Sequence, residues 1–166
     1  MPRRSIVLIT MVLIAGLALP GAAFTADKLA LEVQENGDAL ITFDYTLNWI
    51  ERIAVFFRIA NPEQELKRAL ERAYNRPAAV SSVTPGSATF SVVGLARVSE
   101  TDEGTVYRVP ALDFTYAVDE LERYWFAPLV SVDLAPDLTT VAFPDGYVKT
   151  WYDVTGIPEI SHTIVR

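Results

Sequence analysis

The feature that most constrains the fold is a tight turn between two alternating segments. Asn36 and Gly37 stand at its tip, and this pair favours a type I′ turn because both residues accept positive φ. In the flanking segments, Leu29–Val33 and Ile41–Leu47, every second residue is apolar. A period of two with one apolar face is typical of a half-buried antiparallel pair. The sequence therefore predicts a β-hairpin here.

The period then changes from two to that of a helix. Trp49–Ala60 is apolar around most of its circumference, and Asn48 is a suitable N-cap for it. Asn61-Pro62 begins a second helix, because proline is favoured at the first helical position. This helix has one apolar stripe and ends before Pro77. We expect an inserted helical hairpin.

The remainder of the chain alternates between short apolar segments and turn residues. A single long strand is expected over Thr89–Val98, with a bulge at Gly94, and a short helix begins near Asp119. The predicted fold class is α+β: an antiparallel sheet of about eight strands, able to close into a sandwich, with the helical hairpin packed on one face. The other strands are predicted at Ala79–Val83, Thr105–Val109, Leu112–Tyr116, Leu129–Leu134, Leu138–Phe143, Tyr147–Val154 and around Ile160–Ile164.

Residues 1–26 have the layout of a signal peptide. Arg3 and Arg4 precede an uncharged apolar run, Ile6–Leu19, and small residues allow cleavage before Phe24. The alternative is an uncleaved membrane anchor, since residues 6–26 are long enough to span a bilayer. The sequence thus predicts a single extracytoplasmic domain over residues 27–166, either secreted or tethered to the outer face of the cytoplasmic membrane.

Composition limits the partners and the chemistry. Without Arg3 and Arg4, the chain has 12 basic and 21 acidic residues, a net charge of −9. Such a domain is repelled by nucleic acid and by anionic membrane surfaces, so neither is expected as a partner. The chain has no cysteine, which excludes disulfides, thiolate metal sites and a cysteine nucleophile.

His162 is the single histidine, so any Ser-His-Asp chemistry depends on it. Its neighbours Ile160 and Ile164 are predicted to share its strand face, which favours a structural histidine over a general base. A hydrolase would pair it with an acid such as Asp113 or Asp153. The Gly-x-Ser-x-Gly motif of many hydrolases is missing.

Carboxylates are plentiful, but their spacing matches no metal-binding loop. Asp133, Asp137 and Asp145 all stand beside turn residues, where aspartate usually serves the turn itself. No phosphate-binding glycine loop or dinucleotide motif occurs. We expect no metal and no cofactor.

Aromatic residues are the remaining candidates for recognition. Large aromatic side chains are frequent at interfaces and in sugar-binding sites, although most fill cores. Trp151 and Tyr152 are adjacent on a predicted strand, so one is expected in the core and the other outside. The full candidate set for a ligand or interface is Trp49, Phe56, Phe57, Trp125, Trp151 and Tyr152.

Three short segments carry a resemblance to other proteins: Phe43-Asp44-Tyr45-Thr46-Leu47-Asn48-Trp49, Tyr124-Trp125-Phe126-Ala127-Pro128 and Phe143-Pro144-Asp145-Gly146-Tyr147. They resemble segments of exported, functionally uncharacterised proteins of methanogenic archaea. The resemblance extends over most of the mature chain. It implies an extracytoplasmic setting and no particular activity.

Three functional hypotheses remain open. The first is a non-enzymatic, acidic cell-envelope domain that binds another envelope protein or takes part in a surface assembly. The second is a domain that binds a carbohydrate or small ligand against Trp125 or Trp151. The third is a hydrolase that uses His162. The export signal and the missing catalytic motifs favour the first.

Overall fold

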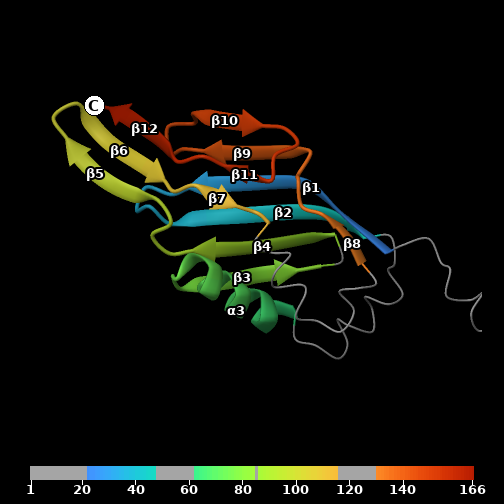
Figure 1. Cartoon of the computed structure of the whole chain (residues 1–166). Coiled ribbons are helices and arrows are strands. Elements are labelled where there is room, and N and C mark those ends of the chain that lie inside the picture. Colours follow the sequence, from blue (N-terminus) through green and yellow to red (C-terminus); the bar gives the residue numbers. More distant parts are fainter. Residues whose placement is uncertain (1–21, 48–61, 85, 116–129) are drawn as a thin grey trace, which may run out of the picture.

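The computed structural model describes residues 22–47, 62–84, 86–115 and 130–166, and these are mostly β structure (Figure 1). Residues 1–21, the first predicted helix and the helix near Asp119 lie outside the described residues. The strands are β1 (Ala22–Val33), β2 (Ala39–Leu47), β3 (Ala78–Val83), β4 (Ser87–Val92), β5 (Arg97–Thr101), β6 (Gly104–Val109), β7 (Leu112–Asp113), β8 (Val130–Asp133), β9 (Leu138–Ala142), β10 (Val148–Trp151), β11 (Gly156–Ile157) and β12 (Ile160–Val165).

The main sheet has the strand order β10-β9-β1-β2-β4-β3, and β8 also pairs with β1. The predicted hairpin is confirmed, because β1 and β2 pair antiparallel with Val33 opposite Ala39. The predicted type I′ turn is wrong, because Gly37 has a positive φ of 85° but Asn36 does not have a positive φ. β1 pairs in parallel with both β8 and β9. The main sheet is therefore mixed.

The predicted fold class is wrong in two respects. The sheet is not purely antiparallel, and no inserted helical hairpin is seen among the described residues, which are mostly strand. The hydrophobic period predicted the strands but carried no information about their partners. The parallel pairing of β1 and β9 joins residues more than 100 positions apart, and local patterns do not encode such a contact.

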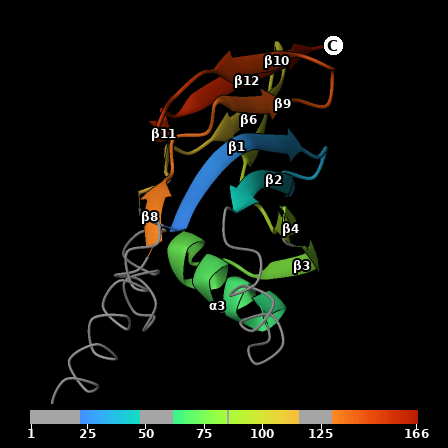
Figure 2. The same ribbon diagram turned by 90° about the vertical axis from the view of Figure 1, so that its right-hand side faces the viewer.

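The one helix within the described ranges is α3 (Pro62–Tyr74), which covers the second predicted helix and contacts β3. Figure 2 shows it beside that end of the main sheet. Leu70 joins the core, while Lys67 and Glu71 form an exposed ion pair one turn apart, with 3.8 Å between Nζ and Oε1. No described helix has the length and apolar character needed to cross a bilayer.

A second layer packs on one face of the main sheet. It consists of the three-stranded sheet β12-β6-β5 and the short pair β11-β7 (Figure 1). Side chains from both layers form one buried cluster, which includes Leu31, Ile41 and Val141 from the main sheet and Val109 and Ile160 from the second layer. The apolar side chains whose alternation predicted the strands thus point into this shared core.

The chain passes from the first layer to the second at Gly94. The predicted single strand over residues 89–98 is wrong, because it is divided into β4 and β5 by a turn. Gly94 has a φ of 58°, and its N–H donates to Asp38 Oδ1 at 2.7 Å. A glycine inside a strand pattern therefore marks a sharp change of direction here and not a bulge.

Three connections lie at one end of the main sheet. β1, β9 and β4 all run toward this end, since β9 is parallel to β1 and β4 pairs antiparallel with β2. The β1–β2 turn, the β9–β10 turn and the β4–β5 connection consequently come together, and the three-stranded sheet extends over them (Figure 1).

Gly37 is buried where the β1–β2 turn meets the second layer. Its φ is +85°, and an added Cβ would lie 2.4 Å from the Ala96 carbonyl oxygen. Gly146, in the β9–β10 turn, has the same φ but nothing within 4 Å of an added Cβ. Alanine substitutions at these two glycines therefore distinguish the cost of backbone strain alone from the cost of strain combined with a steric clash.

We predict that Gly146→Ala lowers the free energy of unfolding by about 1–2 kcal/mol, the cost of positive φ for alanine. Gly37→Ala should cost about 1–3 kcal/mol more, because overpacking adds to that strain. Chemical denaturation of both variants measures the difference. Equal losses would show that the turn does not pack against Ala96.

Candidate functional site

A hollow of about 410 Å³ lies at the end where the turns meet. The β1–β2 turn contributes Glu35, and the β9–β10 turn contributes Pro144 and Asp145. The three-stranded sheet supplies the remaining lining residues: Val98, Glu100, Thr105, Tyr107 and Ile164. The lining is therefore mixed, with three acidic residues beside the apolar side chains of Val98, Pro144 and Ile164.

Tyr107 connects the second layer to the first turn. Tyr107 is only 5% exposed, and its hydroxyl donates to the Glu35 carbonyl oxygen at 3.2 Å. Burial raises the pKa of Tyr107 above its ordinary value, and the negative charges of Glu35, Glu100 and Asp145 raise it further. The phenol therefore stays neutral and keeps its hydrogen to donate to the turn.

Asp145 and His162 connect the second turn to β12. The distance between Asp145 Oδ2 and His162 Nε2 is 2.7 Å, and Asp145 Oδ1 accepts the Tyr147 N–H at 3.1 Å. The Tyr147 ring stacks on the imidazole with 4.4 Å between centroids and 10° between planes. The Phe143 ring is also close, at 4.8 Å. His162 is therefore held by an acid and two aromatic rings.

The acidity of Asp145 follows from these contacts. The hydrogen bond with His162 lowers its pKa below the ordinary value, and the Tyr147 N–H lowers it further. The carboxylate is thus ionised and has both oxygens engaged. Within the described structure, no hydroxyl is hydrogen-bonded to His162.

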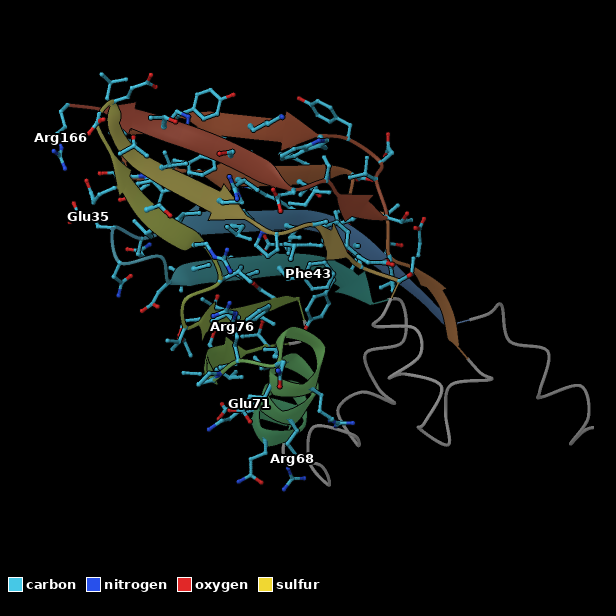
Figure 3. All side chains as sticks on the ribbon, turned by 60° about the vertical axis from the view of Figure 1, so that its left-hand side comes forward. Glu35, Phe43, Arg68, Glu71, Arg76 and Arg166 are labelled. Carbon is cyan, nitrogen blue, oxygen red and sulfur yellow. The ribbon has the colours of Figure 1, made fainter. Side chains whose placement is uncertain are left out.

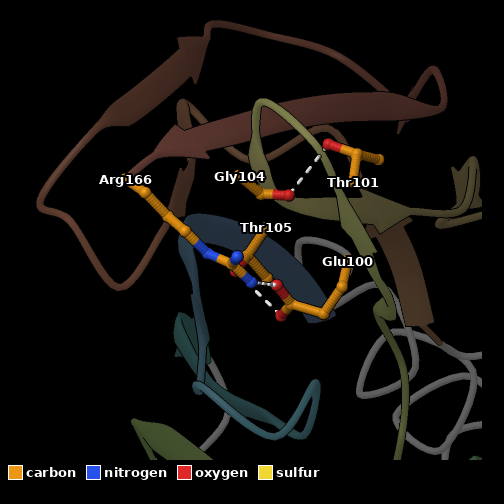
Figure 4. Close-up of polar contacts among 5 residues, drawn as sticks. All are labelled: Glu100, Thr101, Gly104, Thr105 and Arg166. Carbon is orange, nitrogen blue, oxygen red and sulfur yellow. Dashed lines mark hydrogen bonds and ion pairs between the residues drawn. The ribbon is translucent and has the colours of Figure 1, made fainter.

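Glu100 also lines the hollow, and its carboxylate makes two polar contacts (Figure 4). Its Oε1 accepts the Thr105 hydroxyl at 2.9 Å, and its Oε2 is ion-paired with the guanidinium of Arg166. Both charged side chains are mostly exposed. Figure 3 places Arg166 and Glu35 at this same end of the molecule. The edge of the hollow therefore already holds one cationic side chain.

The acidic residues of the hollow are able to contact a positively charged group. Glu35 and Glu100 line a hollow whose wall also includes the apolar side chains of Val98 and Ile164, so a basic side chain can place its charge and its methylene stem together there. A hydrolytic histidine needs a positioned nucleophile, and the described residues supply none. They also hold no group of three or more potential metal ligands.

The structure places some of the sequence-predicted residues and not others. Trp49, Phe56, Phe57 and Trp125 lie outside the described residues. Trp151 is half-buried against the core, with Lys149 Nζ 5.4 Å from its ring centroid. Tyr152 is 68% exposed. The two adjacent aromatic residues are therefore divided between core and surface, as expected, but neither lines the hollow.

His162 shares its strand face with Ile160 and Ile164, as the pattern predicts, since their partners on β6 are alternate residues. Its predicted acidic partners are wrong. Asp113 instead accepts both the N–H and the hydroxyl of Thr115, and Asp153 lies in a turn with a φ of 51°. The residue paired with His162 is Asp145.

Sequence reasoning interpreted Asp145 only as a turn residue and gave Glu35 no role. Each serves a turn, but the parallel pairing of β1 and β9 brings both to one end of the sheet. The available signal was the presence of two tight hairpin turns that contain acids. The strand order is needed to see that the two turns lie at the same end of the sheet and can form one site.

Comparison of this chain with protein-family models, with curated proteins and with solved structures gives no match.

The lowered pKa of Asp145 predicts a specific acid sensitivity. The unfolded chain binds this proton near the ordinary value of 3.8, more readily than the folded protein. The stabilisation is therefore complete above that pH and is lost as pH falls through the lower folded pKa. Asp145→Asn should lose less stability than the parent protein between neutral and acid pH.

Asp113→Asn is the matched control. The pKa of Asp113 is also lowered, first by its hydrogen bond with the Thr115 hydroxyl, so this variant serves as a positive control and should also lose less stability than the parent protein as pH falls. Thermal unfolding at several pH values compares the three proteins. An Asp145→Asn variant with the acid dependence of the parent would contradict the assignment.

Proposed function

We propose that this protein is an exported, acidic, non-enzymatic domain that binds another cell-envelope protein. Its hollow receives a basic side chain, arginine or lysine, from that partner. The observation that carries the proposal is the grouping of Glu35, Glu100 and Asp145 around one partly apolar hollow. Arg166 supports it, because its guanidinium already pairs with one of these acids.

The three acids have different roles in the proposal. Asp145 is occupied by His162 and Tyr147, so it holds the wall of the hollow in place. Glu100 is oriented by the Thr105 hydroxyl and can exchange Arg166 for a cation from the partner. The carboxylate of Glu35 is exposed on the facing turn and provides the second contact.

The net charge favours the same kind of partner. A domain with a charge of −9 after removal of the N-terminal segment attracts a basic surface over a distance and repels acidic ones. The alternatives have less support. A sugar-binding platform at Trp151 is disfavoured because its ring packs against the core, and the hydrolase lacks a nucleophile beside His162 within the described structure.

Titration of the isotope-labelled protein with a short arginine-containing peptide tests the site. We expect amide shifts concentrated at Glu35–Gly37 and Asp145–Tyr147, and none with the same peptide carrying glutamine in place of arginine. The Glu35→Gln, Glu100→Gln double variant should bind roughly threefold to tenfold more weakly, because an exposed ion pair contributes up to about 1 kcal/mol.

The matched control changes two acids elsewhere, Glu63→Gln and Glu159→Gln. Glu63 lies on α3, and Glu159 pairs with Arg108 outside the hollow. Both double variants alter net charge equally. If the control weakens binding as much as the hollow variant does, general electrostatic attraction explains the binding and the proposed site is wrong.

Export is tested by the N-terminus of the native protein. We expect a chain that begins at Phe24, or an intact chain in the membrane fraction. Cleavage before Phe24 removes the pairing of Ala22 and Ala23 with β8 and keeps that of Phe24 with Leu47 and with Val132. Intact mass measured on separated fractions gives the answer. An intact chain in the soluble cytoplasmic fraction would contradict this part of the proposal.

A further inference from the structure

Asn36 and Gly37 form a chemically labile pair. In such a pair, the glycine amide nitrogen can lose its proton and attack the asparagine Cγ. The bond from Cγ to Nδ2 breaks, ammonia leaves, and a succinimide forms. Water then opens this ring to aspartate or isoaspartate. A glycine in the second position offers no side chain to hinder the attack, and Asn36 is exposed.

The folded turn opposes each part of this reaction. The attacking group is occupied, because the Gly37 N–H donates to the Gln34 carbonyl oxygen at 2.9 Å. The amide under attack is held at both ends by Asp38: Asn36 Oδ1 accepts the Asp38 N–H at 3.0 Å, and Asn36 Nδ2 donates to Asp38 Oδ2 at 2.8 Å.

The turn is also fixed from outside. The other oxygen of Asp38 accepts the Gly94 N–H at 2.7 Å, and the Gly37 carbonyl accepts the Ala96 N–H at 2.9 Å. Gly37 is buried so closely against Ala96 that no Cβ fits there. The Asn36–Gly37 peptide therefore cannot reorient for ring closure while the turn remains packed against and hydrogen-bonded to the β4–β5 connection.

We propose that Asn36 is a site of spontaneous deamidation and that the folded turn protects it from this reaction. It reacts only in molecules whose β1–β2 turn has opened away from Gly94 and Ala96. The rate of conversion then reports how often this local opening occurs. The isoaspartate product adds a backbone methylene beside Gly37. The turn therefore cannot pack against Gly94 and Ala96 again, and the opening becomes permanent.

Mass spectrometry of the protein aged in mildly alkaline buffer tests the proposal through the conversion of Asn36 to acid and isoaspartate. We expect the folded protein to react at least about tenfold more slowly than the urea-unfolded chain, because reaction requires local opening. Asp38→Ala removes the contacts to both Asn36 and Gly94, and should react several-fold faster than the parent protein. Equal rates for the folded and unfolded chains would overturn the proposal.

Asp44→Ala is the control, since Asp44 accepts the Ser87 hydroxyl at 2.8 Å on the same hairpin but away from the turn. It should react like the parent protein, and a rate as high as that of Asp38→Ala would overturn the proposal. Hydrogen exchange at the Gly37 amide of the parent protein gives a test that needs no variant. We expect a protected amide there. Unprotected exchange would mean that the turn is not closed.

Discussion

The parallel pairing of β1 with β9 is the constraint on which the functional end of the molecule depends. Each of these strands continues through a tight turn into an antiparallel partner. Parallel alignment places both turns at one end of the sheet, where the second layer lies over them (Figure 1). An antiparallel pairing would have placed Glu35 and Asp145 at opposite ends, with no shared hollow.

Turn chemistry then determines what this end can bind. Tight turns use residues such as asparagine, aspartate and glycine for conformational reasons, and two such turns bring carboxylates to the surface of an already acidic domain. The second layer contributes the buried Tyr107 and the paired His162, each of which holds one turn by a hydrogen bond. The same residues that close the fold thereby form the walls of the hollow.

Much of the local structure could be predicted from the sequence, and the long-range structure could not. Asn36-Gly37 between alternating segments predicted the first hairpin, and β12 carries Ile160, His162 and Ile164 on one face, as expected. The bulge predicted at Gly94 was wrong, because a glycine in a strand pattern has the same local signature in a bulge and in a turn between sheets. Asp145 was missed as the partner of His162, since this pair forms only after β9, β10 and β12 are assembled.

The central claim is that β1 and β9 are parallel and that this brings the β9–β10 turn against β12. Nuclear Overhauser spectroscopy of the folded protein tests it most directly. We predict cross-peaks typical of a parallel ladder between Ala30–Leu31 and Thr140–Val141, together with cross-peaks between the His162 and Tyr147 rings. An antiparallel pattern between these strands, or His162 and Tyr147 rings without a mutual contact, would contradict the account.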